Sequence, residues 1–178
     1  MVNDVDTLTG FKSFGKIPRL SRDMVITEKL DGTNAQIAIS DDGSSIIACS
    51  RNRLITPEDD NYGFARWVQN NADELKEMLG PGRHFGEWWG KGIQHGYGLK
   101  EKRFSLFNTL RWDNKNKPPC CHVVPVLYTG PFDTVKIDYI MELLLDTGSA
   151  AAAGQNAEGI IIYHTASRHM YKKTFKSD

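Results

Sequence analysis

A lysine, an acid and a glycine lie close together in the stretch TEKLDGTN at 27–34. A lysine amine can act as a nucleophile, but only in its neutral form. With an ordinary pKa near 10.4, a lysine is about 0.1% neutral at pH 7.5, which opposes attack by roughly 4 kcal/mol. A nucleophilic Lys29 would therefore need nearby cations or burial to favour the neutral amine. The sequence also allows a plainer interpretation, in which Asp31-Gly32 is a hairpin turn and Lys29 is an exposed residue beside it.

Further short motifs follow this stretch, each with charged or aromatic side chains among glycine and apolar residues. They are SRNR at 50–53, FGEWWGKG at 85–92, RFSLFN at 103–108, AEGIII at 157–162 and YKKTF at 171–175. In this order they resemble the motif series of covalent nucleotidyltransferases, the superfamily of ATP-dependent DNA and RNA ligases and mRNA capping enzymes. The closest resemblance is to the RNA ligase 2-like family, and it extends from about residue 11 to the end of the chain.

The resemblance implies a three-step reaction with three catalytic residues. AMP moves from ATP to Lys29, then to a 5′-phosphate end, and a 3′-hydroxyl finally attacks to join the strands. Glu158 corresponds to the carboxylate that helps to bind Mg²⁺ or Mn²⁺, and Lys172 to a lysine that contacts the α-phosphate. Many relatives have a second lysine two residues later, where this chain has Thr174. A motif that started at Lys173 instead would fit the pattern less well.

The resemblance also implies a set of residues that hold the nucleotide. Glu87 would bind the ribose hydroxyls, and an aromatic residue would stack on adenine, either Phe107 or Phe104. An arginine of the SRNR motif would bind the adenosine or the 5′-phosphate of the substrate; Arg51 fits best and Arg53 is the alternative. The complete nucleotide-binding set is Glu28, Lys29, Asn34, Arg51, Glu87, Phe107 and Lys172.

Hydrophobic periodicity predicts the elements that must position these residues. Strands are predicted at 24–29, 34–40, 45–50, 104–107, 122–127, 159–163 and 170–175, with a turn at 41–43. A helical region is predicted from Thr56, as N-cap, to Leu79, and a second helix over 134–147. The stretches 11–20 and 149–156 are predicted to be loops. Strands outnumber helices, which indicates an α+β fold with mainly antiparallel sheets, as in the adenylyltransferase domain of the resembled family.

Length and charge suggest one domain with a nucleic-acid partner. The 178 residues are expected to form a single adenylyltransferase domain over 1–178, with no C-terminal nucleic-acid-binding domain, and to act as a monomer. The formal net charge is zero, yet seven Lys or Arg face two acids in 91–117 and four face one in 168–178. A neutral total can include a basic face. The partners that the resemblance implies are RNA ends or a nicked duplex.

Other features restrict the cellular setting and leave rival functions open. No apolar run is long enough to span a membrane, and the first ten residues lack a secretion signal. Three cysteines without a C-x-x-C pattern favour a reducing cytoplasm, that of a host cell if the protein is from a phage. A DNA nick ligase and a GTP-using capping enzyme share the same chemistry. The Thr174 departure also permits a nucleic-acid-binding protein with a degenerate site.

Overall fold

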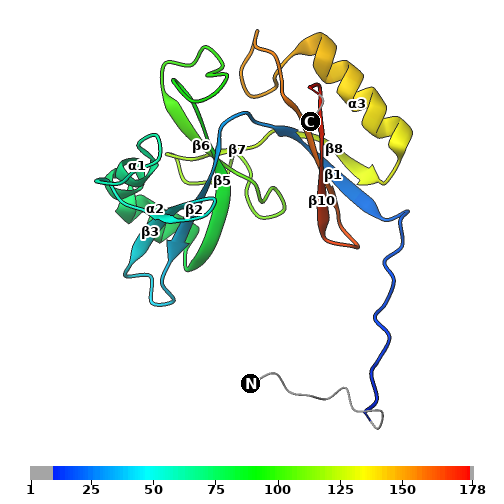
Figure 1. Cartoon of the computed structure of the whole chain (residues 1–178), viewed down its shortest axis with the longest axis horizontal. Coiled ribbons are helices and arrows are strands. Elements are labelled where there is room, and N and C mark those ends of the chain that lie inside the picture. Colours follow the sequence, from blue (N-terminus) through cyan, green and yellow to red (C-terminus); the bar gives the residue numbers. More distant parts are fainter. Residues whose placement is uncertain (1–9, 177–178) are drawn as a thin grey trace.

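The structure is a computed structural model that describes residues 10–176. It contains two sheets that stand side by side, each with helices on one face (Figure 1). The smaller sheet has the strand order β10-β9-β1-β8, and all its pairings are antiparallel. Its strands are β1 (Asp23–Lys29), β8 (Val126–Pro131), β9 (Gly159–His164) and β10 (His169–Thr174).

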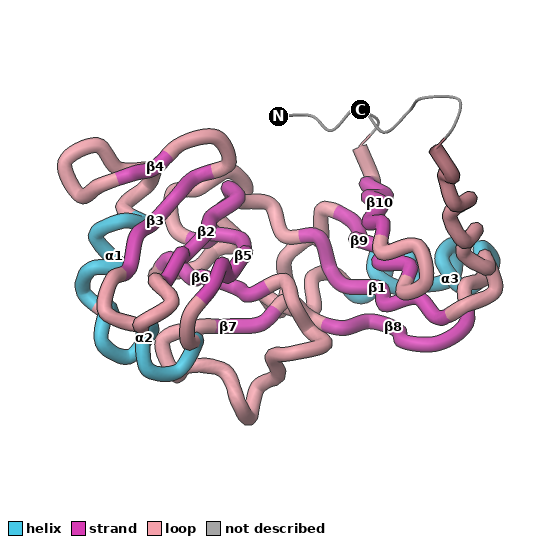
Figure 2. Tube along the Cα trace, turned by 90° about the horizontal axis from the view of Figure 1, so that it is seen from below, coloured by secondary structure: helices cyan, strands magenta, loops and turns pink. Residues whose placement is uncertain are grey.

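The larger sheet has six strands in the order β4-β3-β2-β5-β6-β7 (Figure 2). They are β2 (Thr33–Ile39), β3 (Ile46–Ser50), β4 (Leu54–Ile55), β5 (Gly82–Gly90), β6 (Lys102–Leu106) and β7 (His122–Val123). Only the short β6–β7 pairing is parallel among the described strands. The helices are α1 (Phe64–Asn70), α2 (Ala72–Leu79) and α3 (Thr134–Thr147). The mixed fold with few helices and mainly antiparallel sheets is as the sequence predicted.

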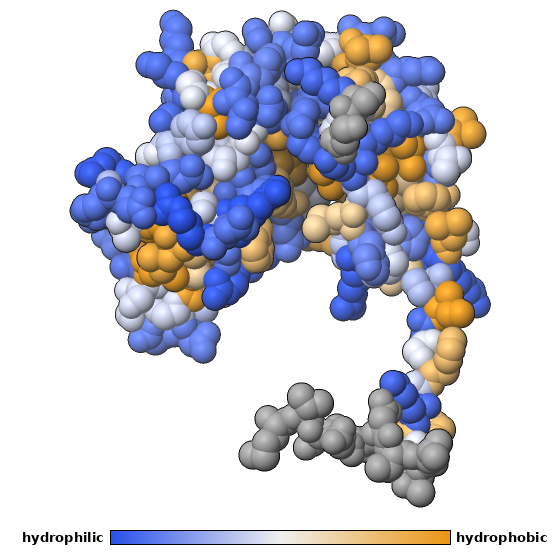
Figure 3. All heavy atoms as spheres, in the orientation of Figure 1, coloured by the Kyte–Doolittle hydropathy of each residue, from blue (hydrophilic) through white to orange (hydrophobic). Residues whose placement is uncertain are grey.

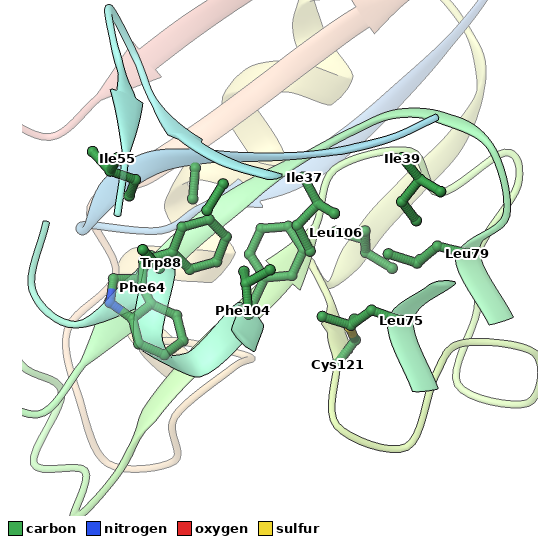
Figure 4. Close-up of a cluster of buried hydrophobic side chains, with 14 of the residues drawn as sticks. Ile37, Ile39, Ile55, Phe64, Leu75, Leu79, Trp88, Phe104, Leu106 and Cys121 are labelled. Carbon is green, nitrogen blue, oxygen red and sulfur yellow. The ribbon is translucent and has the colours of Figure 1, made fainter. Parts of the chain in front are cut away.

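Each sheet has one apolar face because its strands alternate buried and less buried residues. In the larger sheet, Ile37 and Ile39 of β2 pack with Phe104 of β6 against Phe64 of α1 and Leu75 of α2. Figure 4 shows these side chains converging in one cluster. In the smaller sheet, residues of β1 and β9 pack against α3; they are Met24, Ile26, Ile160 and Ile162 against Ile137, Ile140, Met141 and Leu144. The other face of each sheet does not take part in this packing against the helices.

The chain passes from one sheet to the other at Leu30–Gly32 and again at Val124–Pro125. The two passages lie together, because the N–H of Glu28 donates to the carbonyl of Pro125. Leu30 and Val124 of the two passages belong to one buried hydrophobic cluster, together with Trp89, Tyr97 and Ala152. The interpretation of Asp31-Gly32 as a hairpin turn is therefore wrong, since β1 and β2 belong to different sheets.

Gly32 makes a close contact with β5 at this first passage. A Cβ atom added at Gly32 would lie 2.4 Å from the carbonyl oxygen of Trp88 and 2.7 Å from Cβ of Trp89. Only glycine leaves room for the backbones to approach so closely. The passage is thus fixed in place against the strand that carries Glu87.

Two predicted element boundaries are also wrong. Thr56 does not cap a helix; its hydroxyl accepts from the N–H of Asp59 in a local turn. Helix α1 begins at Phe64, after a left-handed Gly63, and the carboxylate of Asp60 accepts from the second and third amides of its first turn. The predicted strand at 122–127 is interrupted, because its residues form the end of one sheet and the start of the other.

The remaining predicted strands, the helix over 134–147 and the loops at 11–20 and 149–156 are confirmed to within one or two residues. Asp133 caps α3 by accepting from the N–H of Val135 at 2.8 Å. Most of the stretch expected to lack a secretion signal lies outside the described residues. Within residues 10–176, no helix has the length and apolar content needed to cross a membrane.

Candidate active site

A cavity of about 920 Å³ lies between the two sheets. Figure 3 shows the surface hollowed at this place. One wall consists of β1, β9 and β10, and the other of β2 and β5 with the segments that follow β3 and β6. Most of the predicted site residues line this cavity, namely Glu28, Lys29, Asn34, Arg51, Glu87, Phe107 and Lys172. These seven residues, from several separate parts of the sequence, are thus gathered around one space.

Lys29 and Glu158 are brought together by the pairing of β1 with β9. Lys29 lies opposite Gly159 in the register, and its Nζ donates to Oε1 of Glu158 at 2.5 Å. Both side chains are largely shielded from solvent, with 24% and 27% of their surfaces exposed. The second oxygen of Glu158, Oε2, is buried and accepts no hydrogen bond from residues 10–176. A carboxylate oxygen in that condition suits a cation.

A chain of polar contacts crosses the opposite wall. Arg51 donates from Nε at 2.8 Å and from a terminal nitrogen at 2.6 Å to Oδ1 of Asn34. Asn34 in turn donates from Nδ2 to Oε2 of Glu87 at 3.2 Å, across the pairing of β2 with β5. Arg53, the alternative to Arg51, instead pairs with Asp59 at 2.7 Å. The geometry therefore favours Arg51 as the arginine that serves the cavity.

Glu87 is an acid with an unusual environment. Burial raises its pKa to about 7, although the charge of Lys29 and the hydrogen bond from Asn34 both oppose this. The negative charge of Glu158 adds to the increase. Glu87 consequently changes its protonation state near neutral pH.

The aromatic alternatives have different surroundings. Phe104 has no exposed surface, and its ring lies 5.2 Å from that of Phe64 and 5.7 Å from that of Trp67. Phe107 follows β6, lines the cavity and is 37% exposed. Across the cavity stands an apolar wall of Val25, Ile161, Tyr163 and Met170. Phe107 can therefore contact a planar group in the cavity, whereas Phe104 belongs to the core.

The two adjacent lysines of β10 lie on opposite faces of their strand, as strand alternation requires. Lys172 lines the cavity. Lys173 donates to Oδ1 of Asp138 on α3 at 2.5 Å. The geometry thus separates the two and favours Lys172 as the site residue.

Glu28 is the member of the predicted set whose carboxylate is engaged elsewhere. It neighbours Lys29 on β1, but its side chain is 1% exposed and contacts the loop after α3. Its oxygens accept from the hydroxyl of Ser149 and from the N–H groups of Ala150 and Ala151. Burial raises the pKa of Glu28, and these three donors counteract that increase.

Two residues that contact the passage after Lys29, Tyr97 and His95, were not identified from the sequence. The N–H of Asp31 donates to the hydroxyl of Tyr97 at 2.8 Å, and the carboxylate of Asp31 accepts from the N–H of His95 at 3.3 Å. Tyr97 has a left-handed backbone, with φ of 52°. The glycine-rich run GKGIQHGYG was the available signal, since such runs allow unusual backbone conformations.

Among residues 10–176 there is no cluster of three or more His, Cys, Asp or Glu side chains that could enclose a metal ion. A divalent ion at Glu158 would have to share its coordination with other ligands, such as phosphate oxygens or water.

Comparison with solved structures supports the fold assignment. A Naegleria gruberi RNA ligase mutant with AMP and Mn is 18% identical, with a TM-score of 0.65 over 87% of this chain and 50% of that chain. A second mutant of that ligase, with ATP and Mn, is 19% identical, with a TM-score of 0.64 and the same coverage. An apo mutant is 18% identical, with a TM-score of 0.63. At this identity the likeness concerns the fold, and the chain spans about half the length of these structures.

Comparison with curated proteins gives no match. The family model described as RNA ligase matches residues 22–177, which include every residue around the cavity. By this match across most of its length, the chain belongs to the RNA ligase family.

Proposed function

We propose that the chain is the adenylyltransferase unit of an ATP-dependent RNA ligase, with a nucleotidyltransferase fold, and that Lys29 carries AMP as a covalent intermediate. The observation that carries the proposal is the contact with Glu158 made by Lys29, which lines a cavity whose other wall offers Glu87 and Phe107. A nucleophile, a metal-binding carboxylate, a ribose acceptor and an aromatic platform are what such a transfer requires.

In the first step, Nζ of Lys29 attacks the α-phosphorus of ATP. A nitrogen–phosphorus bond forms, the bond to the pyrophosphate oxygen breaks, and the amine loses its proton. Oε1 of Glu158 already accepts a hydrogen bond from Nζ and is the nearest acceptor for that proton. Lys172, on the same wall, offers positive charge to the α-phosphate as pyrophosphate leaves.

A divalent cation, Mg²⁺ or Mn²⁺, would neutralise phosphate charge when bound. The unpaired Oε2 of Glu158 fits this role, because a buried carboxylate oxygen without a donor has a vacant acceptor position. The described residues form no group of three or more His, Cys, Asp or Glu side chains that could enclose the ion there. The remaining ligands would come from phosphates and water, as is usual for Mg²⁺.

The adenosine would lie between the two walls. Phe107 would stack on the base from one side, while Ile161 and Tyr163 close the other side. Glu87 would accept hydrogen bonds from the ribose hydroxyls, which requires its ionised form. Asn34 and Arg51, which are linked to Glu87 by hydrogen bonds, would orient the phosphates. Glu28 is not part of this set, because its carboxylate is held by the loop after α3.

The proposed partners are RNA ends or a nicked duplex with a 5′-phosphate and a 3′-hydroxyl. Phosphate contacts would come from the basic segments 91–117 and 168–178. A duplex would hold both ends in register, so we expect nicks to be sealed faster than free single strands are joined. A 2′-hydroxyl at the 3′ terminus would let the enzyme prefer RNA over DNA.

The direct test is the intact mass of the protein after incubation with Mg²⁺ and each nucleotide in turn. We expect ATP to add one AMP through an acid-labile, alkali-stable bond. Lys29→Ala should abolish the adduct, and Lys29→Arg should do the same because a guanidinium stays charged. Lys173→Ala is the matched control and should retain the adduct. An adduct on Lys29→Ala would overturn the assignment, and a GMP adduct instead of AMP would indicate a capping enzyme.

The substrate is tested by single-turnover sealing with pre-adenylylated protein. The nicks should differ only in whether the terminal 3′ nucleotide is ribose or deoxyribose. Faster sealing of the ribose nick is expected, whereas equal rates would indicate a general or DNA ligase. Failure to seal either nick with Lys29 fully adenylylated would limit the chain to AMP transfer. A protein that forms no adduct yet binds RNA would instead be a binding protein with a degenerate site.

A further inference from the structure

Glu28 is a buried acid immediately before the proposed nucleophile, on the opposite face of β1. Burying a carboxylate costs several kcal/mol unless donors surround it. Three donors do so here: the hydroxyl of Ser149 lies 2.6 Å from Oε1, and the N–H groups of Ala150 and Ala151 lie 2.8 and 3.0 Å from Oε2. A contact so completely satisfied stabilises one arrangement of β1 and the loop after α3.

The hydrogen bonds of Ser149 fix the direction of this contact. Its Oγ also accepts from the N–H groups of Ala151 at 3.1 Å and Ala152 at 3.0 Å. Because both lone pairs are then in use, the single hydroxyl proton is left for Oε1 of Glu28. Glu28 thus acts as an acceptor only, with hydrogen bonds to both of its carboxylate oxygens, although the N–H of Ala151 is shared with Oγ of Ser149.

The loop held by Glu28 leads directly to Glu158. Residues 149–156 have no regular secondary structure and consist mostly of small side chains. The loop closes on itself where the N–H of Ser149 donates to the carbonyl of Gln155 at 2.7 Å. Glu158 follows three residues later, just before β9 begins at Gly159. The position of the loop therefore affects where the carboxylate of Glu158 is presented.

The β1–β9 pairing ends at this same place. Lys29 opposite Gly159 is the last pair of the register, so Glu158 itself lies outside the ladder. The hydrogen bonds between Glu28 and the loop connect β1 to the segment before β9, beyond the last pair of residues in the β1–β9 register. A reacting group displaced by 1 Å can lose about 100-fold in rate.

We propose that Glu28 is a positioning residue for AMP transfer, which holds Lys29 and Glu158 in their mutual geometry by anchoring the 149–156 loop. This inference rests on the proposed function, and it assigns to the carboxylate of Glu28 a role other than contact with the nucleotide. Ser149 is the partner through which it acts. Ser149 does not line the cavity, so its effect on the reaction must pass through Glu28 or the loop.

The test compares Ser149→Ala, Glu28→Gln and their double variant in single-turnover adenylylation at varied ATP concentration. Ser149→Ala removes the hydroxyl donor; Glu28→Gln keeps the size of the side chain but turns an NH₂ group toward at least one of the three donors. We expect each to lower the maximal rate by roughly 10- to 100-fold and to change the half-saturating ATP concentration less than about threefold. The double variant should be no slower than the worse single variant, because both break the same contact.

Thr147→Ala is the matched control, since it removes a hydroxyl bond to the carbonyl of Leu143 two residues from Ser149 without touching Glu28. Its maximal rate should equal that of the unaltered protein. Rates are normalised to the folded fraction from melting curves, and if Ser149→Ala does not fold, Glu28→Gln decides. An unchanged rate per folded molecule would overturn the inference, as would a raised half-saturation with an unchanged maximal rate.

Competitive labelling of lysine amines by acetic anhydride separates this inference from the proposed function. Pairing with Glu158 should shield Lys29, so its labelling should rise severalfold in Ser149→Ala, while Lys173, on the other side of its sheet, stays unchanged as an internal reference. A rise without any AMP adduct on the unaltered protein would support the positioning role and refute the proposed function. Unchanged labelling with normal adenylylation would refute the positioning role alone.

Discussion

Replacing each of the two phenylalanines of the RFSLFN motif by alanine should produce opposite effects. Phe104 is fully buried and contacts the rings of Phe64 and Trp67, so Phe104→Ala leaves a cavity in the core of the larger sheet. Such a substitution typically costs about 3–5 kcal/mol. In a protein of this size each kcal/mol lowers the melting temperature by roughly 2–4 °C, so a decrease of about 6–20 °C is expected.

Phe107 is more than one-third exposed and belongs to no core cluster of the described residues, so Phe107→Ala should cost at most about 1 kcal/mol in stability. Its effect should be on the nucleotide. Stacking of an aromatic side chain on a base contributes about 1–3 kcal/mol, which corresponds to roughly 5- to 150-fold weaker ATP binding.

The assay for both variants is a thermal melt paired with the ATP dependence of Lys29 adenylylation, measured on the folded protein. Phe104→Ala should melt early yet bind ATP within about threefold of the unaltered protein, whereas Phe107→Ala should melt normally and require more ATP. Phe107→Leu controls for loss of bulk, since it keeps an apolar side chain without a ring. Normal ATP dependence in Phe107→Ala would refute the stacking role and the reasoning that located the base.

Three further predictions concern single positions. Gly32→Ala should destabilise the protein by several kcal/mol in urea unfolding, because its Cβ would overlap the β5 backbone, and a stability within 1 kcal/mol would contradict the described contact. Burial raises the pKa of Glu87 to about 7, so its unfavourable ionisation in the folded state should reduce stability as pH rises from about 4.5 to 7. Above pH 7, the free energy of unfolding of Glu87→Gln should therefore exceed that of the unaltered protein by up to about 3 kcal/mol, and below pH 4.5 the two should be equal. ATP binding to the unaltered protein should strengthen as the pH rises through the same range. Lys172→Ala should slow adenylylation at least tenfold, but Lys173→Ala, which loses only an exposed pair with Asp138, should leave the rate unchanged in the same mass assay.

Local patterns predicted much of the fold, since alternation and turn signals depend on neighbouring residues. The strands around Lys29 and Glu158 and the helix over 134–147 follow from such patterns. Thr56 shows the limit, because a hydroxyl that can cap a helix can equally close a turn. Asp31-Gly32 shows it again, since nothing local distinguishes a hairpin from a passage between sheets.

The candidate site was predictable where a motif identified a residue and uncertain where two similar residues competed. Phe104 against Phe107 and Lys172 against Lys173 depend on which face of a strand meets the cavity, and that depends on packing far away in the sequence. Glu28 is different, because alternation along β1 already implies that it and Lys29 point to opposite faces. Glu28 was assigned to the nucleotide because it lies in the same motif as Lys29, whereas strand alternation already gave a reason to assign the two residues different roles.

The two adjacent passages between the sheets have a consequence for biosynthesis. The larger sheet is built from one uninterrupted stretch, β2 to β7, and it can form as soon as that stretch has left the ribosome. The smaller sheet must wait, because among the described strands β1 pairs with β8 and β9, which begin only at Val126 and Gly159. Lys29 therefore meets Glu158 only after the chain has been made as far as β9. A nascent chain would therefore form the cavity wall of β2 and β5 before the wall of β1, β9 and β10.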